Sequence, residues 1–286
     1  MSADPGGHRR VAPHSRRPRA PGRRPVRGAA TPNSKDTGMK IGVIGTGNIG
    51  GTLARKLSAA GHQVRVANSK GPDGVRAFAE EIGATPADAH GAVAGADLVI
   101  LSIPFPAVAQ LPKDLFDGLP EATPIVDTGN YYPGLRDPQI AELDAGKTES
   151  VWVSEQIGRP IVKAFNNILA HSLAELGRPA GAPDRIAVAV AGDAEAAKRT
   201  VMDIVDQVGF DPVDGGSLAE SWRQQPATPG YCCDYDAETM REALLAAVKG
   251  EAPKTLNRVY GLLGKLGPNP SHAEMIAMNR SVHAAD

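Results

Sequence analysis

The sequence contains few aromatic residues and almost no cysteine. Aromatic residues make up 4% of the 286 residues, and small residues such as Gly are abundant, a composition that suits helices packed closely on a sheet. The only cysteines, Cys232 and Cys233, are adjacent, and neighbouring cysteines do not normally form an unstrained disulfide. Because no disulfide framework is indicated, we expect a reducing, cytoplasmic setting.

Long apolar runs and a strong net charge are also missing. The longest apolar segment, 98–103, is far shorter than the roughly 18–20 residues of a membrane span, so we expect no membrane partner. The formal net charge is −1, which argues against a nucleic-acid partner. The charge is unevenly distributed, because residues 1–38 hold nine Lys and Arg against two Asp and Glu. This leaves 22 against 30 for Met39 onward, a net charge of −8.

The chain divides into three parts by composition and periodicity. Residues 1–38 are rich in Arg, Pro and Gly without hydrophobic periodicity, so we predict a disordered tail. Residues 39–183 alternate strand and helix patterns, which predicts an α/β fold with a doubly wound parallel (Rossmann) sheet. Residues 184–286 repeat the alternation on a smaller scale and end in three helical segments. We expect this smaller, C-terminal α/β to helical part to serve substrate binding or oligomerisation. The predicted strands are 40–44, 63–68, 84–85, 97–103, 124–127, 161–165, 185–191 and 210–213.

The first strand leads into the pattern G-x-G-x-x-G, formed by Gly45, Gly47 and Gly50. Gly45 permits a sharp turn, Gly47 leaves room for a pyrophosphate beside the main chain, and Gly50 lets the following helix approach the strand. The start of that helix offers free N–H groups and a partial positive charge to phosphates. Because strand, turn and helix occur in order, the pattern predicts dinucleotide binding.

The end of the second strand indicates which dinucleotide binds. An NAD-specific site carries an acidic residue here, which accepts hydrogen bonds from the ribose 2′-hydroxyl. This sequence has Asn68, Ser69 and Lys70 instead. Ser69 can donate a hydrogen bond to a 2′-phosphate and Lys70 can supply positive charge, so the segment favours NADP over NAD.

The nicotinamide ring should lie along the carboxyl edge of the sheet, where ligands bind such folds. Three segments follow strands at that edge. They are Ser102-Ile103-Pro104, Thr128-Gly129-Asn130 and Asn166-Asn167-Ile168.

In these segments the sequence resembles the NADP-linked reductases of the deazaflavin coenzyme F420. The matching pieces, found in order between Met39 and Gly216, are MKIGVIGTGNIG, NSKGP, ADLVILSIPF, IVKAFNNILA and AGDAEAAKRTVMDIVDQVGFDPVDGG. The resemblance implies that Thr46, Gly47, Asn48 and Ile49 hold the pyrophosphate. It further implies that Ser69 and Lys70 hold the 2′-phosphate, and that Ile103, Ile168 and Ala170 line the nicotinamide. Members of that family move a hydride directly between two rings, which implies neither a metal nor a dedicated proton donor.

Two departures bear on the second substrate. Asn166 stands where archaeal members carry histidine, and the irregular stretch 217–235 has no counterpart in them. Trp222, Arg223 and Gln224 in this stretch are candidates for the substrate pocket, since Trp stacks and Arg binds anions. A helix with its polar face outward, or a dimer contact, would explain the same residues. His171 is a weak candidate for a proton donor.

Three functions remain open from the sequence. The first is an NADPH-dependent oxidoreductase of the F420-reductase type, with F420 as a possible second substrate. The second is the same enzyme with a small carbonyl, imine or metal-chelate acceptor. The third is a non-catalytic redox sensor that binds NADPH.

Overall fold

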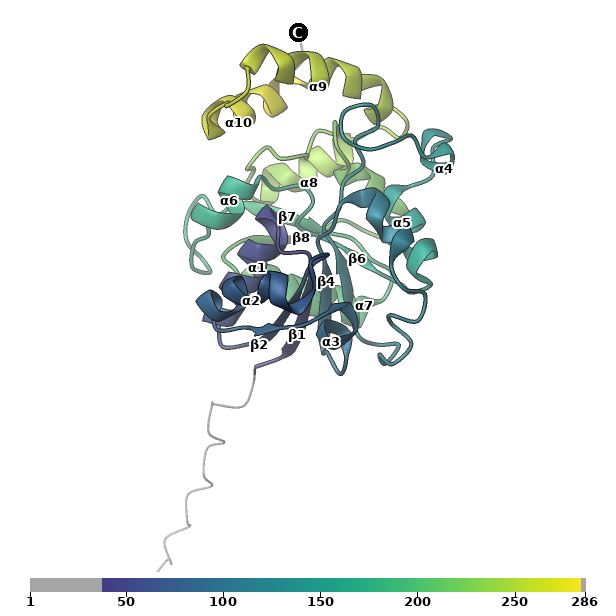
Figure 1. The fold of residues 1–286 in the computed structure, drawn as a ribbon. Coiled ribbons are helices and arrows are strands. Elements are labelled where there is room, and N and C mark those ends of the chain that lie inside the picture. Colours follow the sequence, from purple (N-terminus) through teal and green to yellow (C-terminus); the bar gives the residue numbers. More distant parts are fainter. Residues whose placement is uncertain (1–37, 284–286) are drawn as a thin grey trace, which may run out of the picture. The chain divides into compact units, whose positions relative to one another are not determined.

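The computed structural model describes residues 38–283, so the tail predicted for residues 1–38 lies outside the described residues apart from Gly38. The main sheet has six parallel strands in the order β3-β2-β1-β4-β5-β6, which confirms the predicted doubly wound fold (Figure 1). The strands are β1 (Lys40–Ile44), β2 (Gln63–Ala67), β3 (Thr85–Pro86), β4 (Leu98–Leu101), β5 (Ile125–Asp127) and β6 (Val162–Lys163).

The register at the centre of the sheet places short apolar residues side by side. Val43 of β1 pairs with Val66 of β2 on one side and with Ile100 of β4 on the other, and all three are fully buried. From β1, the chain adds β2 and β3 on one side of the sheet and then β4, β5 and β6 on the other side. Ligands bind outside the carboxyl ends of the strands where the strand order reverses in this way.

Successive strand residues face two separate cores. One core joins Ile41 and Val43 to helices α1 (Asn48–Ala59), α2 (Gly71–Ile82) and α7 (Glu195–Gln207). The other core joins Ile44 and Leu101 to α3 (Ala89–Val93), the 3-10 helix η1 (Phe105–Gln110) and α5 (Glu149–Ile157). Because both faces are covered, the strands read as apolar runs in the sequence.

A second, two-stranded sheet adjoins β6. Its parallel strands are β7 (Ala187–Val190) and β8 (Asp211–Asp214), and Ala191 exchanges backbone hydrogen bonds with Lys163. Helix α8 (Ala237–Ala246) covers its outer face with Met240 and Leu244. The division of function at residue 183 stays a prediction.

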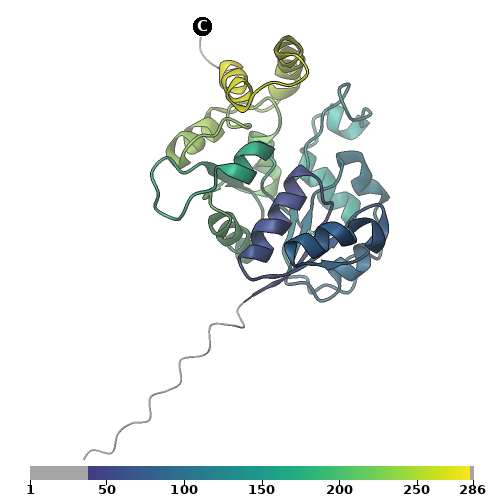
Figure 2. The same ribbon diagram turned by 60° about the vertical axis from the view of Figure 1, so that its left-hand side comes forward.

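The chain ends in two helices that lie side by side, α9 (Ala252–Leu266) and α10 (His272–Ser281), at the top of Figures 1 and 2. Helix α10 begins with a capping box between Ser271 and Glu274. No residue of α9 is fully buried. Within residues 38–283, no helix combines the length and apolar composition that crossing a membrane requires.

Three helical elements of the structure were not predicted from the sequence. Helix α5 lies where no helix was predicted, α6 (Ala170–Glu175) follows β6, and the 3-10 helix η2 (Leu218–Gln224) opens the stretch predicted to be irregular. The predicted strands are found within about two residues of their expected ends, and a short helix, α4 (Ala141–Asp144), precedes α5.

Charged side chains are buried at the carboxyl ends of β5 and β6. Lys163 donates a hydrogen bond of 2.7 Å to Asp127 and another to the carbonyl oxygen of Gly129, and neither charged side chain is more than 2% exposed. Glu149 of α5 lies close to this pair and accepts a hydrogen bond from the backbone N–H of Tyr131. Burial raises the pKa of Glu149 to about 8, although the charge of Lys163 acts in the opposite direction.

This raised pKa makes folding stability depend on pH. Between the ordinary pKa of 4.5 and about 8, only the folded protein keeps the Glu149 proton. The free energy of unfolding should therefore fall by about 1.4 kcal/mol per pH unit as the pH rises through this window. Glu149→Gln cannot ionise, so urea unfolding of this variant should show a correspondingly smaller decline than the wild type. Glu155→Gln, exposed on the same helix, is the control and should keep the wild-type slope. If the free energy of unfolding depended on pH equally in the wild type and in Glu149→Gln, the raised pKa of Glu149 would be contradicted.

Candidate functional site: the glycine turn and a tyrosine-lined chamber

The three glycines of the first turn have the distinct roles that the sequence analysis expected. Gly45 adopts φ +99°, and a Cβ there would meet the carbonyl oxygen of Ser102 at the end of β4. A Cβ on Gly50 would meet the carbonyl oxygen of Gly45 and the side chain of Ser102. A Cβ on Gly47 would meet nothing within 4 Å. Gly45 and Gly50 thus permit close packing of turn, helix and strand, whereas Gly47 leaves open space beside the main chain.

The N-terminus of α1 faces this open space. Gly47 is the N-cap residue and supplies no side-chain cap, so the backbone N–H groups of Asn48, Ile49 and Gly50 at the first turn are left for an anion. Gly47 and Asn48 are exposed, and Thr46 is half-buried. The predicted pyrophosphate residues are therefore gathered around an uncapped helix start.

A network of hydrogen bonds connects the glycine turn to the end of β2. The Asn68 side chain donates to the Thr46 hydroxyl over 3.3 Å and accepts from the backbone N–H of Lys70 over 2.9 Å. Ser69 and Lys70 are exposed and lie at the start of α2. The structure therefore brings Ser69 and Lys70 to the same edge as the glycine turn, with no carboxylate at their positions.

The predicted nicotinamide residues lie at the ends of β4 and β6. Ser102 accepts a hydrogen bond of 3.0 Å from the Thr128 hydroxyl, which ties the ends of β4 and β5 together. Ile103 is half-buried and Pro104 is exposed. Ile168 is only 4% exposed, and Ala170 opens α6. Their contact with the nicotinamide stays a prediction.

Asn166 and Gln224 are buried in a shared amide network. Asn166 donates to Asn130 and to the Gln224 carbonyl oxygen, and the Gln224 amide donates back to Asn166 over 2.8 Å. Both residues are at most 2% exposed. Phe165, just before this network, has φ +59°, a strained conformation for a bulky residue. The network fixes the loop after β6 against η2.

The remaining candidate residues, Trp222, Arg223 and His171, lie at two places. Arg223 donates to the carbonyl oxygens of Leu244 and Ala247 at the end of α8 and lies over the Trp222 ring at 4.5 Å. Trp222 lines a cavity of about 220 Å³ that also includes Lys147 and Lys249. His171 is exposed, with its ring 4.5 Å from that of His272. Trp222 and Arg223 therefore lie together, whereas His171 lies beside His272, and the roles of all three stay predictions.

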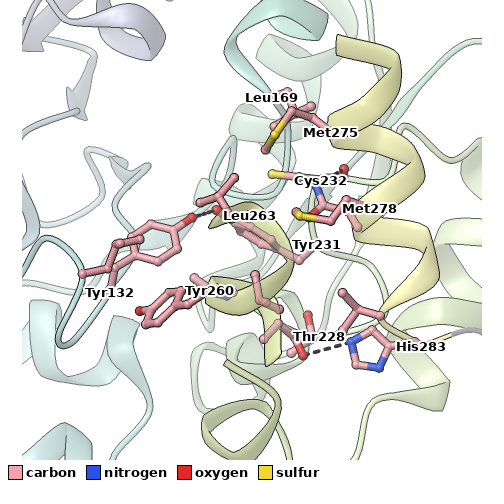
Figure 3. A pocket seen from close by; sticks show the side chains of 16 residues that line it. Tyr132, Leu169, Thr228, Tyr231, Cys232, Tyr260, Leu263, Met275, Met278 and His283 are labelled. Carbon is pink, nitrogen blue, oxygen red and sulfur yellow. Dashed lines mark hydrogen bonds between the residues drawn. The ribbon is translucent and has the colours of Figure 1, made fainter. Parts of the chain in front are cut away.

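Sequence reasoning missed a second cavity, which we call the tyrosine chamber. It encloses about 150 Å³ between the loops after β5 and β6, the 226–232 loop and helices α9 and α10 (Figure 3). Its lining residues are Tyr132, Leu135, Leu169, Pro226, Ala227, Thr228, Tyr231, Cys232, Val259, Tyr260, Leu263, Met275, Met278, Asn279, Val282 and His283. These residues come from five separate segments, so no local spacing could have indicated the chamber.

Metal-binding chemistry is not indicated in the part of the chain that the structure describes. Across residues 38–283, no group of three or more His, Cys, Asp or Glu side chains is placed to hold a metal ion. Cys232 and Cys233 are buried and free. Burial raises the pKa of the Cys233 thiol to about 11 and also raises that of Cys232, so neither is an activated thiolate.

The strand order and the glycine turn place the chain in the class of doubly wound (Rossmann) folds. Comparison with known proteins identifies the family within that class. The family model described as NADP oxidoreductase, coenzyme F420-dependent, matches residues 40–131. The chain belongs to this family.

Three individual proteins are similar to this chain. The protein YjhV of Escherichia coli K12 is 52% identical over 105 residues, which cover 37% of this chain and 77% of YjhV. The solved structure of hypothetical protein SMa0349 from Sinorhizobium meliloti is 30% identical with a TM-score of 0.56, and covers 65% of this chain and 89% of its own. A "putative F420 dependent NADP-reductase" from Arthrobacter sp. FB24 has 24% identity and a TM-score of 0.55, with 79% and 96% covered. The last likeness shows the shared fold.

The open space at Gly47 leads to a prediction about cofactor binding. Gly47→Ala should fold normally, because its Cβ meets no atom within 4 Å. The same methyl group lies where a pyrophosphate approaches the main chain, so NADPH affinity should fall at least tenfold, about 1.4 kcal/mol. Thermal melting and NADPH fluorescence titration measure the two quantities. Gly118→Ala, also in open space, is the control and should change neither. Unchanged NADPH affinity in Gly47→Ala would place the pyrophosphate elsewhere.

Proposed function

We propose that the protein is an NADP(H)-dependent oxidoreductase that transfers a hydride between the nicotinamide and a second substrate. The observation that carries this proposal is the position of Ser69 and Lys70. They lie at the end of β2, linked through Asn68 to the glycine turn, where an NAD-specific enzyme has a carboxylate. A cation and a hydroxyl there favour a 2′-phosphate.

The residues present fit such a cofactor along the whole edge of the sheet. The uncapped start of α1 can receive the pyrophosphate, and the turn at Gly47 leaves room for it. Ile103 follows β4, and Ala170 opens α6 after β6, so both come after strands at the edge where the ring would lie. Lys70 would compensate the additional charge of the 2′-phosphate at the other end.

When bound, NADPH supplies a hydride from its nicotinamide ring. The task of the protein is then to hold two reacting groups at near-contact distance in the correct orientation. The tie between Ser102 and Thr128 and the buried pair of Lys163 with Asp127 fix the turns at this edge. Holding the two reacting groups in this way does not require a metal ligand from the protein.

The second substrate has two candidate classes. Coenzyme F420 is the acceptor that the resemblance suggests, and a small carbonyl, imine or metal chelate is the alternative within the same chemistry. NADPH oxidation measured with F420 and with representatives of these classes distinguishes them. Binding of NADPH without oxidation by any acceptor would instead favour the redox sensor.

The Lys70 assignment can be tested by comparing the two cofactors. Lys70→Ala should weaken NADPH binding by about 1–2 kcal/mol, the size of one charge-assisted hydrogen bond, and should leave NADH binding nearly unchanged. Titrations with each cofactor measure both affinities. Lys254→Ala, which removes another exposed lysine, is the control and should affect neither. Equal losses for NADPH and NADH in Lys70→Ala would refute the preference for NADP.

A further inference from the structure

Two of the segments that line the tyrosine chamber follow β5 and β6. Tyr132 comes two residues after the turn that ends β5, and Leu169 lies between Ile168 and Ala170 after β6. Both therefore extend from the edge that the proposed function assigns to the nicotinamide. Ala227 and Cys232, which also line the chamber, have φ of +64° and +53°. Backbone strain of this kind clusters at ligand sites.

The size of the chamber corresponds to one ring. Its volume is about 150 Å³, and an apolar protein cavity of about this volume binds benzene. Aliphatic and thioether side chains such as Leu263, Met275 and Met278 form much of its wall (Figure 3). The chamber therefore suits a single ring with apolar faces.

The wall of the chamber carries no charge to balance an ionic ligand. Its lining includes no Asp, Glu, Lys or Arg. Burial raises the pKa of Tyr132 and of Tyr231, and burial lowers the pKa of His283 below its ordinary value of 6.5. These groups are all neutral near pH 7. An anion would lose its hydration there without a counter-charge from the lining residues, which is costly.

The chamber does offer a hydroxyl hydrogen-bond donor to a neutral ligand. The hydroxyls of Tyr132 and Tyr231 point toward one another and form a hydrogen bond (Figure 3). Two hydroxyls contain two protons, and this bond uses one of them. The other proton has the Cys232 sulfur beside it, which is a weak acceptor. By contrast, the Tyr260 hydroxyl donates to the Pro133 carbonyl oxygen and the Thr228 hydroxyl to that of Gln225.

We propose that the tyrosine chamber binds the reacting part of the acceptor, an uncharged, ring-sized carbonyl compound, and that the Tyr132–Tyr231 pair donates a hydrogen bond to its oxygen. This inference rests on the proposed function, because the hydride comes from NADPH. The hydride carries two electrons to the carbonyl carbon, the tyrosine pair delivers a proton to the oxygen, and solvent returns a proton to the pair. The products are an alcohol and NADP⁺.

The first test compares two ligands that differ in charge. Benzaldehyde is the neutral one-ring probe, and 4-carboxybenzaldehyde adds an anion to the same ring. Calorimetry with the full-length protein should detect benzaldehyde binding at least tenfold tighter than binding of the carboxylate. Equal affinity for the two ligands would contradict a neutral chamber.

The second test fills the chamber. Leu263→Trp adds bulk from α9 into the cavity and should weaken benzaldehyde binding at least tenfold. Asn257→Trp adds the same bulk at an exposed position of the same helix, outside the chamber lining, and should leave binding unchanged. Equal benzaldehyde affinity in both variants and the wild type would overturn the site assignment.

The third test concerns the donor. Tyr132→Phe and Tyr231→Phe each leave one hydroxyl with one proton, so each single variant should keep most of the NADPH-dependent turnover of benzaldehyde. The double variant removes both hydroxyls and should lower kcat by about 100-fold, the scale of a lost proton donor, while NADPH affinity stays constant. A double variant as active as the single variants would exclude the pair as donor.

These measurements separate the inference from the proposed function. NADPH titration reports the proposed function without any acceptor. NADPH could bind with the predicted dependence on Lys70 while Leu263→Trp reduced another acceptor as well as the wild type does. In that case only the chamber assignment would fail. If Leu263→Trp abolished benzaldehyde binding but NADPH did not bind, the chamber would stand as a site and the proposed hydride transfer would fail.

Discussion

The structure depends on how closely the first turn approaches the end of β4. Side-chain-free positions at Gly45 and Gly50 let the turn, the start of α1 and Ser102 come into contact that any Cβ would prevent. This contact sets the position of the helix N-terminus relative to the ends of β1 and β4, at the point where the sheet changes its direction of growth. The free N–H groups, the Asn68 bridge and the Ser69–Lys70 segment all derive their positions from it.

A second constraint organises the opposite half of the edge. Lys163 is buried, so its charge must be compensated within the protein. Asp127 and the Gly129 carbonyl oxygen provide that compensation and thereby join the ends of β5 and β6. The loops that continue from these strands carry Tyr132 and Leu169 to the tyrosine chamber. The buried pair thus holds the loops proposed to bind the acceptor, much as the glycine turn holds the segments proposed to bind the cofactor.

The sequence predicted most of the main sheet because its signals are local. Each strand is a short apolar run that ends at Gly, Pro or a polar cluster, and the glycine turn requires specific residues at fixed spacing. Helix α5 was missed for a physical reason. It buries Glu149 and Ser150 together with Trp152 and Val153, so polar and apolar residues do not separate onto two faces and the helical period is weak.

The acceptor side was less predictable because tertiary contacts decide what each residue does. Arg223 was a candidate for binding anions because of its residue type, but its N–H groups donate to carbonyl oxygens at the end of α8. Gln224 is buried in an amide network with Asn166. The tyrosine chamber is formed by residues up to about 150 positions apart in the sequence, which come together only when α9 and α10 pack over the strand ends.

The two halves of the proposed site would select their ligands by opposite physical means. At the cofactor end, an exposed lysine and backbone N–H groups attract phosphate charge, although the protein from Met39 onward has a net charge of −8. Such local attraction is what allows an acidic protein to bind an anionic cofactor. In the chamber, the absence of charged side chains from the lining excludes anions through the cost of desolvation. An acceptor with an anionic tail could therefore place a neutral ring in the chamber only if its tail stayed in solvent. The charge of the acceptor's buried part, rather than that of the whole molecule, is then the property on which the chamber discriminates.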